Sequence, residues 1–376
     1  MLNKNVDLQY LKDKVKTGER LLRDEAISLW RLAGFAELGA LANSVREQQH
    51  PEGIVTYLID RNINYTNVCN TDCQFCAFYR PNSAHPESYV LTKEELATKI
   101  EETLELGGTR ILLQGGHNDD LPFDYYLDLI SWIHETYGID LNAFSPSEIH
   151  QMKLISGLSY EEILKQLQAA GMHGLPGGGA ELLDEDIRKA ISPKKIPAEL
   201  WIEIMETAQN LGLVTTSSMV IGVNETIEQR MNHFDQLRNL QDRSTAKGLE
   251  GFNLFVSWPM QINENTSLGR SKRSSTMGAS TVDYIKNLAF ARIYLDNIKN
   301  HQSSWPSCGP DVAEIGLHFG CNDFGSTMIE ENVVSQAGGH TAAQSLLPPE
   351  EMVLRIQKSG FKAAQRNSDF EIVRRH

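Results

Sequence analysis

The stretch Tyr65-Thr-Asn-Val-Cys69-Asn-Thr-Asp-Cys73-Gln-Phe75-Cys76 carries three of the five cysteines of the chain within eight residues. The spacing of these cysteines is Cys-x3-Cys-x2-Cys. Three thiolates on one short loop can bind three irons of a cubane iron–sulfur cluster and leave the fourth iron without a protein ligand. An open coordination position is typical of a catalytic metal site. The pattern therefore predicts a 4Fe-4S cluster bound by Cys69, Cys73 and Cys76.

Zinc binding and simple burial are the alternative interpretations of these cysteines. A zinc site would need a fourth ligand, usually from a second Cys-x2-Cys or a histidine pair, and no such pair follows in the sequence. Disulfide bonds cannot pair all three thiols of so short a loop. The two remaining cysteines, Cys308 and Cys321, stand alone and are more typical of small buried apolar residues than of ligands.

Composition limits the partners and the compartment of the protein. The chain has 376 residues, of which 41% are hydrophobic, which is enough for one barrel-sized domain with extensions. Its net charge of −14 disfavours nucleic acids and anionic membranes as partners, since both bind basic surfaces. The sequence has neither a signal-peptide pattern nor a run of about 20 apolar residues. With no secreted disulfide framework either, we expect a soluble, cytoplasmic protein.

Outward from the cysteine loop, short apolar runs alternate with segments of helical length and periodicity. Capping boxes at Thr92–Glu95 and Ser159–Glu162 mark the starts of two helices. This alternation predicts repeated βα units and an α/β fold with a parallel sheet, either a TIM-type (β/α) barrel or an open doubly wound sheet. The expected strands span residues 53–59, 109–114, 139–144, 172–175, 214–221 and 252–258.

Polar and glycine-rich segments follow several of these strands, which favours the barrel because such barrels gather their site at the carboxyl ends of the strands. We therefore expect residues 1–50 to form an N-terminal helical extension and residues 51–300 to form the barrel. A helix is expected at about 282–300. Residues 301–376 would form a C-terminal extension that closes the barrel and covers the substrate.

The cysteine spacing, with Phe75 before the third cysteine and a strand before the loop, resembles that of the radical S-adenosylmethionine (radical SAM) superfamily. Further segments resemble, in order along the chain, the cyclic dehypoxanthine futalosine synthases of the futalosine branch of menaquinone biosynthesis. This likeness extends from about residue 20 to the carboxyl terminus. The segments that carry it are 60–69, 76–80, 114–116, 145–149, 176–181, 191–195 and 322–332.

The resemblance implies a TIM-type barrel enzyme that uses a 4Fe-4S cluster and S-adenosylmethionine to cyclise dehypoxanthine futalosine. In that reaction a 5′-deoxyadenosyl radical abstracts hydrogen from C4′ of the ribose, and the carbon radical adds to the benzoate ring. A flavodoxin- or ferredoxin-like electron donor is also implied. Aminofutalosine synthase and the deazaflavin-precursor synthase have similar loops and remain alternatives. From other classes, a zinc-stabilised binding module and a scaffold that binds the cluster without turnover remain open.

The resemblance also assigns cofactor contacts. Backbone carbonyls of the Gln114–Gly116 turn would hold the amino group of the methionine moiety. Glu181 and Arg188 fall where the superfamily often places an acid for the ribose or amino group and an arginine for the carboxylate, although Arg188 also fits a solvated helix position. The expected cofactor-binding residues are Phe75, Gln114, Gly115, Gly116, Glu148, Glu181 and Arg188.

Substrate and proton-transfer residues are harder to choose from the sequence. Four candidates for substrate contact are Arg61, Arg80, Asn322 and Asp323. The base for the final proton loss could be His318, His340 or Glu330, each of which equally fits a packed or solvated position.

Two positions depart from the family pattern. Val223 stands where the family tends to have histidine, and His173-Gly174 stands where Asp-Ser is expected. We expect both departures to affect substrate recognition more than cluster binding.

Overall fold

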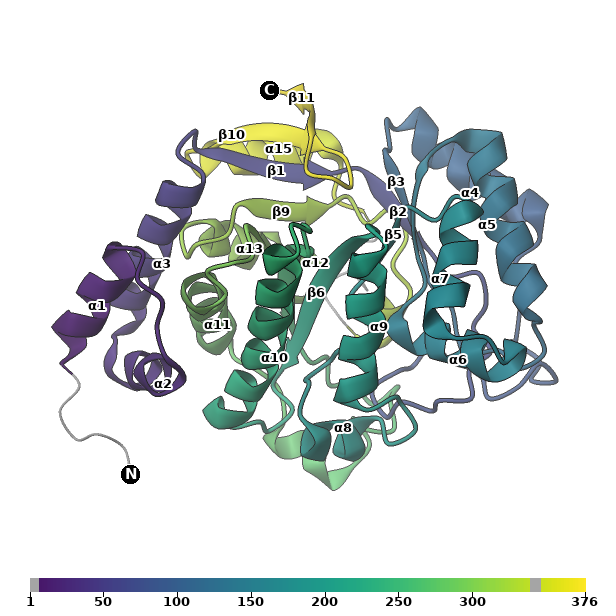
Figure 1. Cartoon of the computed structure of the whole chain (residues 1–376), viewed down its shortest axis with the longest axis horizontal. Coiled ribbons are helices and arrows are strands. Elements are labelled where there is room, and N and C mark those ends of the chain that lie inside the picture. The colour runs from purple at the N-terminus through teal and green to yellow at the C-terminus, as the bar shows by residue number, and fades with distance from the viewer. Residues whose placement is uncertain (1–6, 339–345) are drawn as a thin grey trace.

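A computed structural model describes residues 7–338 and 346–376 of the chain (Figure 1). The strands of this described part form one sheet in the order β11-β10-β1-β9-β8-β7-β6-β5-β4-β3-β2. They are β1 (Ile54–Leu58), β2 (Asp60–Ile63), β3 (Arg110–Leu113), β4 (Asp140–Ala143), β5 (Gly174–Leu175), β6 (Val214–Ile221), β7 (Phe252–Pro259), β8 (Asn300–Ser303), β9 (Asp323–Ser326), β10 (Lys362–Arg366) and β11 (Ile372–Arg375).

The sheet closes on itself through the segment 54–63. Only Ile59 separates β1 from β2, and β1 pairs in parallel with β9 while β2 pairs in parallel with β3. The strands from β3 to β9 join these two edges through further parallel pairs. The expected TIM-type barrel is therefore confirmed, and the open doubly wound sheet is wrong.

Helices cover this barrel because alternate residues of a strand point outward, and many of these outward residues are apolar. Ile111, Leu141 and Met219 are fully buried on this outer side. Both predicted capping boxes are present at Thr92 and Ser159. The helices that follow the cysteine loop are α4 (Lys93–Glu105), α5 (Phe123–Tyr137), α6 (Pro146–Ser156), α7 (Tyr160–Ala169), α8 (Glu185–Ile191), α9 (Ala198–Asn210), α10 (Ile227–Ala246), α11 (Thr281–Tyr294), α12 (Trp305–Cys308), α13 (Pro310–Leu317), α14 (Val333–Gln336) and α15 (Pro349–Lys358), with a 3-10 turn at Lys272–Thr276.

The N-terminal extension is helical, as expected. It consists of α1 (Leu8–Lys16), α2 (Arg23–Leu32) and α3 (Phe35–Gln49), which lie at one side of the barrel (Figure 1). Its α3 packs against α11, and Trp30 of α2 meets the Phe290 ring edge-on with centroids 5.2 Å apart. The extension is thus bound to the outer helical layer rather than to the strands.

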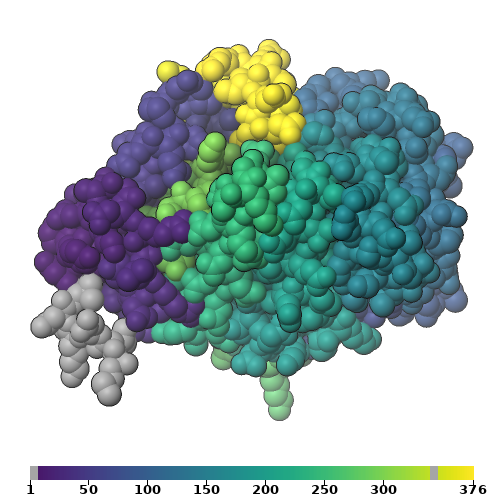
Figure 2. Space-filling view, in the orientation of Figure 1, coloured from purple at the N-terminus to yellow at the C-terminus, as the bar shows by residue number. Residues whose placement is uncertain are grey.

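The C-terminal part contributes more to the barrel than the sequence indicated. The expected helix at 282–300 is α11, which ends at Tyr294, and β8 begins at Asn300. Strands β8 and β9 complete the barrel, so the sheet does not end at the boundary of 300 that we expected. Strand β10 pairs with β1 outside the ring of parallel strands. Figure 2 shows this C-terminal segment (yellow) wedged between the residues near β1 and the part of the chain that includes α4 and α5.

A buried ion pair fixes the C-terminal hairpin to the barrel. Arg366 of β10 donates from Nε to Asp323 Oδ2 at 2.6 Å, and Thr56 Oγ1 donates to the same oxygen at 2.7 Å. Both charged side chains are almost fully buried, with 2% and 0% exposed. Asp323 begins β9, so this pair closes the N-terminal end of the barrel. In the described part of the chain, the helices are too short or too polar to cross a membrane.

Candidate active site

The cysteine loop follows β2 and is tied down on both sides. Cys69 N–H donates to the Arg80 carbonyl at 2.9 Å, and Arg80 N–H donates to the Asn67 carbonyl at 2.7 Å. Asn70 N–H reaches the carbonyl of His117 beyond β3, and Gln74 N–H reaches the carbonyl of Ile191 in α8. The loop is therefore held against two other loops at the carboxyl ends of the strands, where barrel enzymes have their sites.

The three thiols fit a cluster better than a single metal ion. Within the described residues, one group of three ligand-type side chains has all donor atoms within 4.8 Å of one another, and the three cysteines do not form that group. A zinc ion needs its sulfur ligands at about 2.3 Å from one centre, whereas in a cubane cluster each cysteine binds a different iron. Among the described residues the three thiols thus do not form a compact single-ion site, which agrees with the predicted cluster.

Burial affects the protonation of two of the three thiols in the metal-free protein. Burial raises the pKa of Cys73 to about 12 and also raises the pKa of Cys76. Both thiols therefore stay protonated at neutral pH unless a positive charge compensates for the lost solvation. An iron–sulfur core supplies that charge and deprotonates coordinating thiols.

The Gln114–Gly116 turn lies directly against this loop. Gly116 N–H donates to the Thr66 carbonyl at 3.1 Å. A Cβ atom on Gly116 would lie 2.1 Å from the Val68 carbonyl oxygen and 2.8 Å from Cys69 Cβ. Only glycine allows this approach, so the turn places its backbone beside the first cysteine.

Glu148 holds the Gln114–Gly116 turn in place through a hydrogen bond to its backbone. Its Oε1 accepts hydrogen bonds from Gly115 N–H at 2.9 Å and from the Tyr65 hydroxyl at 2.8 Å. The side chain is 4% exposed, and burial raises the pKa of Glu148 to about 7. Glu148 lies in the first turn of helix α6, whose N-cap is Ser145. Its contacts make it a residue that positions the turn, and its expected direct contact with cofactor stays a prediction.

A cluster of charges lies on the other side of the cysteine loop. Lys195 donates from Nζ to Glu181 Oε1 at 2.5 Å, and the Arg188 guanidinium lies 3.9 Å from Glu181 Oε2. Glu181 Oε2 is buried and has no hydrogen-bond partner among the described residues. The Lys195 ammonium also lies 5.6 Å from the centre of the Phe75 ring, between Cys73 and Cys76 in the sequence. The group therefore lies beside the cysteine loop.

Arg188 has a different place from the one we expected. Its guanidinium is 3% exposed and donates to the carbonyls of Ala180 at 2.6 Å and Ile196 at 3.1 Å. These bonds hold the loop after β5 against the segment after α8. They occupy the donors that a cofactor carboxylate would need, so the structure does not support the predicted carboxylate contact.

Sequence reasoning missed Lys195 and gave no role to His117. Burial lowers the pKa of His117 to about 3, so its imidazole is neutral, and Nδ1 lies 2.9 Å from Thr71 Oγ1. Lys195 stood in a segment that resembles the family, but only the fold brings it beside Glu181 and Phe75. A lysine after a short helix gives no such signal by itself.

The expected substrate arginines make internal contacts. Arg61 points outward from β2 and donates to the carbonyl of Lys99 and to Glu102 at 2.7 Å each. Arg80 donates to the carbonyls of Phe78 and Tyr79 at the end of the cysteine loop and to Glu87. These contacts explain both arginines as residues that hold the loop and the helical layer. Their assignment to the substrate carboxylate finds no support in the structure.

Three further candidates lie at the wrong end of the barrel. Asp323 is engaged by Arg366, and Asn322 accepts from Arg292 Nη2 at 2.6 Å and donates to Asn300 at 2.9 Å. His318 precedes β9, and its ring packs on Phe361 with centroids 5.2 Å apart. Residues that precede parallel strands lie opposite the expected site, so the structure gives these assignments no support.

The last two base candidates have different outcomes. His340 lies outside the described residues. Glu330 follows β9 on the side of the cysteine loop and is bound by Lys99 Nζ at 2.6 Å and by Asn332 Nδ2 at 2.9 Å. Its role as a base stays a prediction. Asn332 also donates to Asn64 Oδ1 at 3.1 Å, which draws this segment over the end of β2.

Backbone strain is concentrated at the same end of the barrel. Positive φ angles of non-glycine residues cost energy and persist mainly where the surroundings enforce them. Glu181 has a φ of 39° and Phe144, just before Ser145, has a φ of 64°. Most of these residues follow a barrel strand: they are Asp72, Phe144, Glu181, Asn224 and Met328, with Phe370 at the other end.

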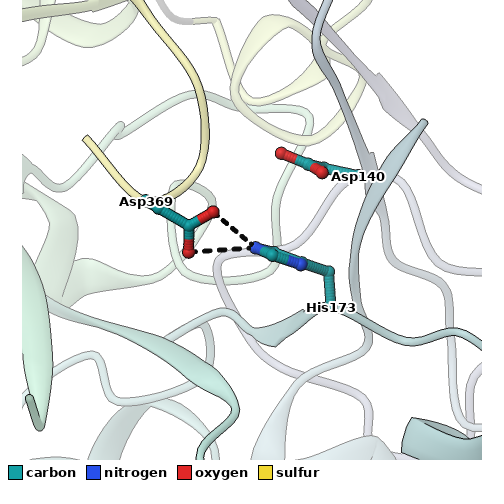
Figure 3. A group of neighbouring side chains, drawn as sticks. All are labelled: Asp140, His173 and Asp369. Atoms are coloured by element: carbon teal, nitrogen blue, oxygen red, sulfur yellow. Dashed lines mark hydrogen bonds and ion pairs between the residues drawn. The ribbon is translucent and has the colours of Figure 1, made fainter. Parts of the chain in front are cut away.

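A second group of ligand-type side chains lies at the opposite end, shown in Figure 3. Asp140 begins β4, His173 immediately precedes β5, and Asp369 belongs to the β10–β11 connection. His173 Nε2 lies 3.2 Å from Asp369 Oδ1, and the two side chains are 31% and 38% exposed. We interpret the group as a surface tie between the C-terminal hairpin and the barrel, because such half-exposed groups need no ion.

Comparison with known proteins agrees with this geometry. Residues 63–237 match the family model "Radical SAM superfamily", and residues 249–375 match the model "CofH/MqnC C-terminal region". A solved structure, that of methylornithine synthase, superposes with a TM-score of 0.69 at 17% identity and covers 94% of this chain and 97% of its own. That likeness concerns the fold alone.

Two relatives share much more sequence. The cyclic dehypoxanthine futalosine synthase of Halalkalibacterium halodurans is 43% identical over 96% of this chain and 94% of its own length. The enzyme of the same name from Streptomyces coelicolor is 38% identical over 98% of this chain and 90% of its own length. With three thiols at the mouth of a TIM-type barrel, the chain belongs to the radical SAM superfamily and, within it, to the family of cyclic dehypoxanthine futalosine synthases.

Proposed function

We propose that this protein converts dehypoxanthine futalosine to cyclic dehypoxanthine futalosine in menaquinone biosynthesis. The observation that carries the proposal is the set of three thiols on one loop at the carboxyl end of the barrel, in a chain 43% identical to an enzyme of that name. When bound, the 4Fe-4S cluster and S-adenosylmethionine supply the one-electron chemistry that starts the cyclisation.

The residues of the chain hold and orient these groups. Cys69, Cys73 and Cys76 would bind three irons and leave the fourth to the cofactor. The Gln114–Gly116 turn, fixed by Glu148, would present backbone groups to the methionine moiety. Glu181 Oε2, which is buried and has no hydrogen-bond partner within the part of the chain that the structure describes, is an acceptor available to the cofactor.

The interior of the barrel offers polar groups to the substrate. Ile63 and Leu141 face the helices. Side chains alternate along a strand, so their neighbours Asn62 and Asn142 face the interior of the barrel. The oxygens Asn62 Oδ1 and Asn142 Oδ1 are buried and lack partners within the described residues. Buried acceptors without partners are costly. We propose that they accept hydrogen bonds from the ribose hydroxyls of the substrate.

The segment after β9 supports exclusion of water. It is drawn over the end of β2 through the bond from Asn332 to Asn64 and through the ion pair between Glu330 and Lys99. We propose that this segment covers the substrate. A flavodoxin- or ferredoxin-like electron donor and a cytoplasmic location complete the proposal, because a cluster sensitive to oxygen needs a reducing compartment.

The test is a product assay under anaerobic conditions. Reconstituted and chemically reduced protein is incubated with S-adenosylmethionine and dehypoxanthine futalosine, and the products are separated by mass. We expect the cyclic product from the natural protein and from Cys321→Ala, and none from Cys73→Ala. Intact substrate beside accumulating 5′-deoxyadenosine would contradict the cyclase and favour an aminofutalosine synthase or deazaflavin-precursor synthase activity. Zinc without sulfide in the isolated protein would contradict any radical SAM activity.

A further inference from the structure

Lys195 is a charged residue of the site to which the reaction gives no role. Its side chain is 14% exposed, and its ammonium is bound to Glu181 and lies 5.6 Å from the Phe75 ring centre. The hypothetical Cβ of Gly179 would be 3.6 Å from the same nitrogen, so the loop after β5 closes on it. An ammonium held this firmly among polar and aromatic groups acts as a fixed charge.

The charges around Lys195 leave an excess of positive charge. Glu181 is the one carboxylate bound to it, and Arg188 lies 3.9 Å from the other oxygen of that carboxylate. Two cations therefore share one anion. His117, on the opposite loop, is neutral because burial lowers its pKa to about 3. The nearest acid of the cysteine loop, Asp72, is half-exposed and is engaged by Lys194 at 3.6 Å.

This excess faces the cysteine loop. Phe75 stands between Cys73 and Cys76, and Lys195 lies against its ring. The Lys195 side chain is largely buried beside this loop, and a buried charge acts on its neighbours more strongly than a charge in water.

We infer that Lys195, held in place by Glu181, is a fixed positive charge that raises the reduction potential of the 4Fe-4S cluster for which the three cysteines provide ligands. The cluster gains one electron from a one-electron donor of low potential and thereby gains one negative charge. A nearby fixed cation stabilises the more negative, reduced form, as net charge is one of the properties that set cluster potentials. This inference rests on the cluster of the proposed function but not on its substrate.

The experiment is a redox titration of reconstituted protein without S-adenosylmethionine, followed by the electron paramagnetic resonance signal of the reduced cluster. We expect Lys195→Gln to shift the midpoint to more negative potential. Lys195→Arg, which keeps the charge, should restore most of the natural value. Lys194→Gln is the matched control. Lys194 is the preceding residue in the sequence, but its side chain is 60% exposed, so solvent screens its charge.

A second variant has the opposite expected sign. Glu181→Gln leaves Lys195 and Arg188 without their carboxylate, so the midpoint should move to less negative potential. This variant keeps the inference testable if Lys195→Gln loads too little iron. Equal midpoints in Lys195→Gln and Lys194→Gln, or a more negative midpoint in Glu181→Gln, would overturn it. A protein that shows both shifts yet makes no cyclic product would uphold the inference and refute the proposed reaction.

Discussion

Replacing Glu148 by glutamine should remove a pH dependence of stability that this buried carboxyl imposes. Burial raises the pKa of Glu148 from 4.5 to about 7 in the folded protein. The folded state therefore binds the proton more tightly than the unfolded state. The stabilising contribution is complete below about pH 4.5 and is lost as the pH rises through about 7.

The size of the effect follows from that shift. A difference of roughly 2.5 pKa units corresponds to about 3 kcal/mol, because each unit is worth about 1.4 kcal/mol. With these two pKa values, one for the unfolded and one for the folded state, about 1 kcal/mol of the stabilising contribution is lost between pH 6 and pH 8. Glutamine retains an oxygen that can accept from Tyr65 and Gly115 but has no proton to lose. The free energy of unfolding of Glu148→Gln should therefore fall less with rising pH than that of the natural protein.

Urea unfolding of the metal-free protein at pH 6, 7 and 8 measures this difference. Glu161→Gln carries the same substitution at an exposed position on α7 and serves as the control. The reasoning is refuted if Glu148→Gln and the natural protein lose the same free energy between pH 6 and pH 8. A variant that also binds less iron would indicate that Glu148 positions the Gln114–Gly116 turn against the cysteine loop.

Three further variants test one close contact within the site and two contacts at the opposite end of the barrel. Gly116→Ala should bind less iron, because the added methyl would lie 2.1 Å from the Val68 carbonyl oxygen. The ratio of iron to protein measures this loss. The control Gly34→Ala adds a methyl where nothing lies within 4 Å, so it should bind the natural amount of iron. Arg366→Ala should lower the free energy of unfolding by about 3–5 kcal/mol, because it leaves Asp323 charged and buried. Its control Arg375→Ala removes a cation that is 63% exposed, and a loss as large as that of Arg366→Ala in urea unfolding would contradict the argument. His173→Ala should change the free energy of unfolding by less than about 1 kcal/mol and leave the iron content unchanged. A protein that loses a bound metal with His173→Ala would show that Asp140, His173 and Asp369 form an ion site after all.

The sequence by itself predicted the cluster ligands and determined the type of fold. The Cys-x3-Cys-x2-Cys spacing is local, so it needs no folded context to be read. The strands β3 to β7 carry apolar residues toward the helices, and the capping boxes at Thr92 and Ser159 lie within four residues of chain. These signals depend on neighbours in the sequence, and the structure confirms the barrel that they predicted.

Only the tertiary structure decided the last two strands and the roles of most charged residues. Strands β8 and β9 read as Asn-His-Gln-Ser and Asp-Phe-Gly-Ser, which are too polar to signal a strand. Asp323 looked like a substrate residue until Arg366, 43 positions later, proved to be its buried partner. Arg188 lies in the short helix α8 and Lys195 lies just after it, yet the first binds carbonyls and the second lies beside the cysteine loop. A charged side chain takes its role from the groups that surround it in space, and those come from distant parts of the chain.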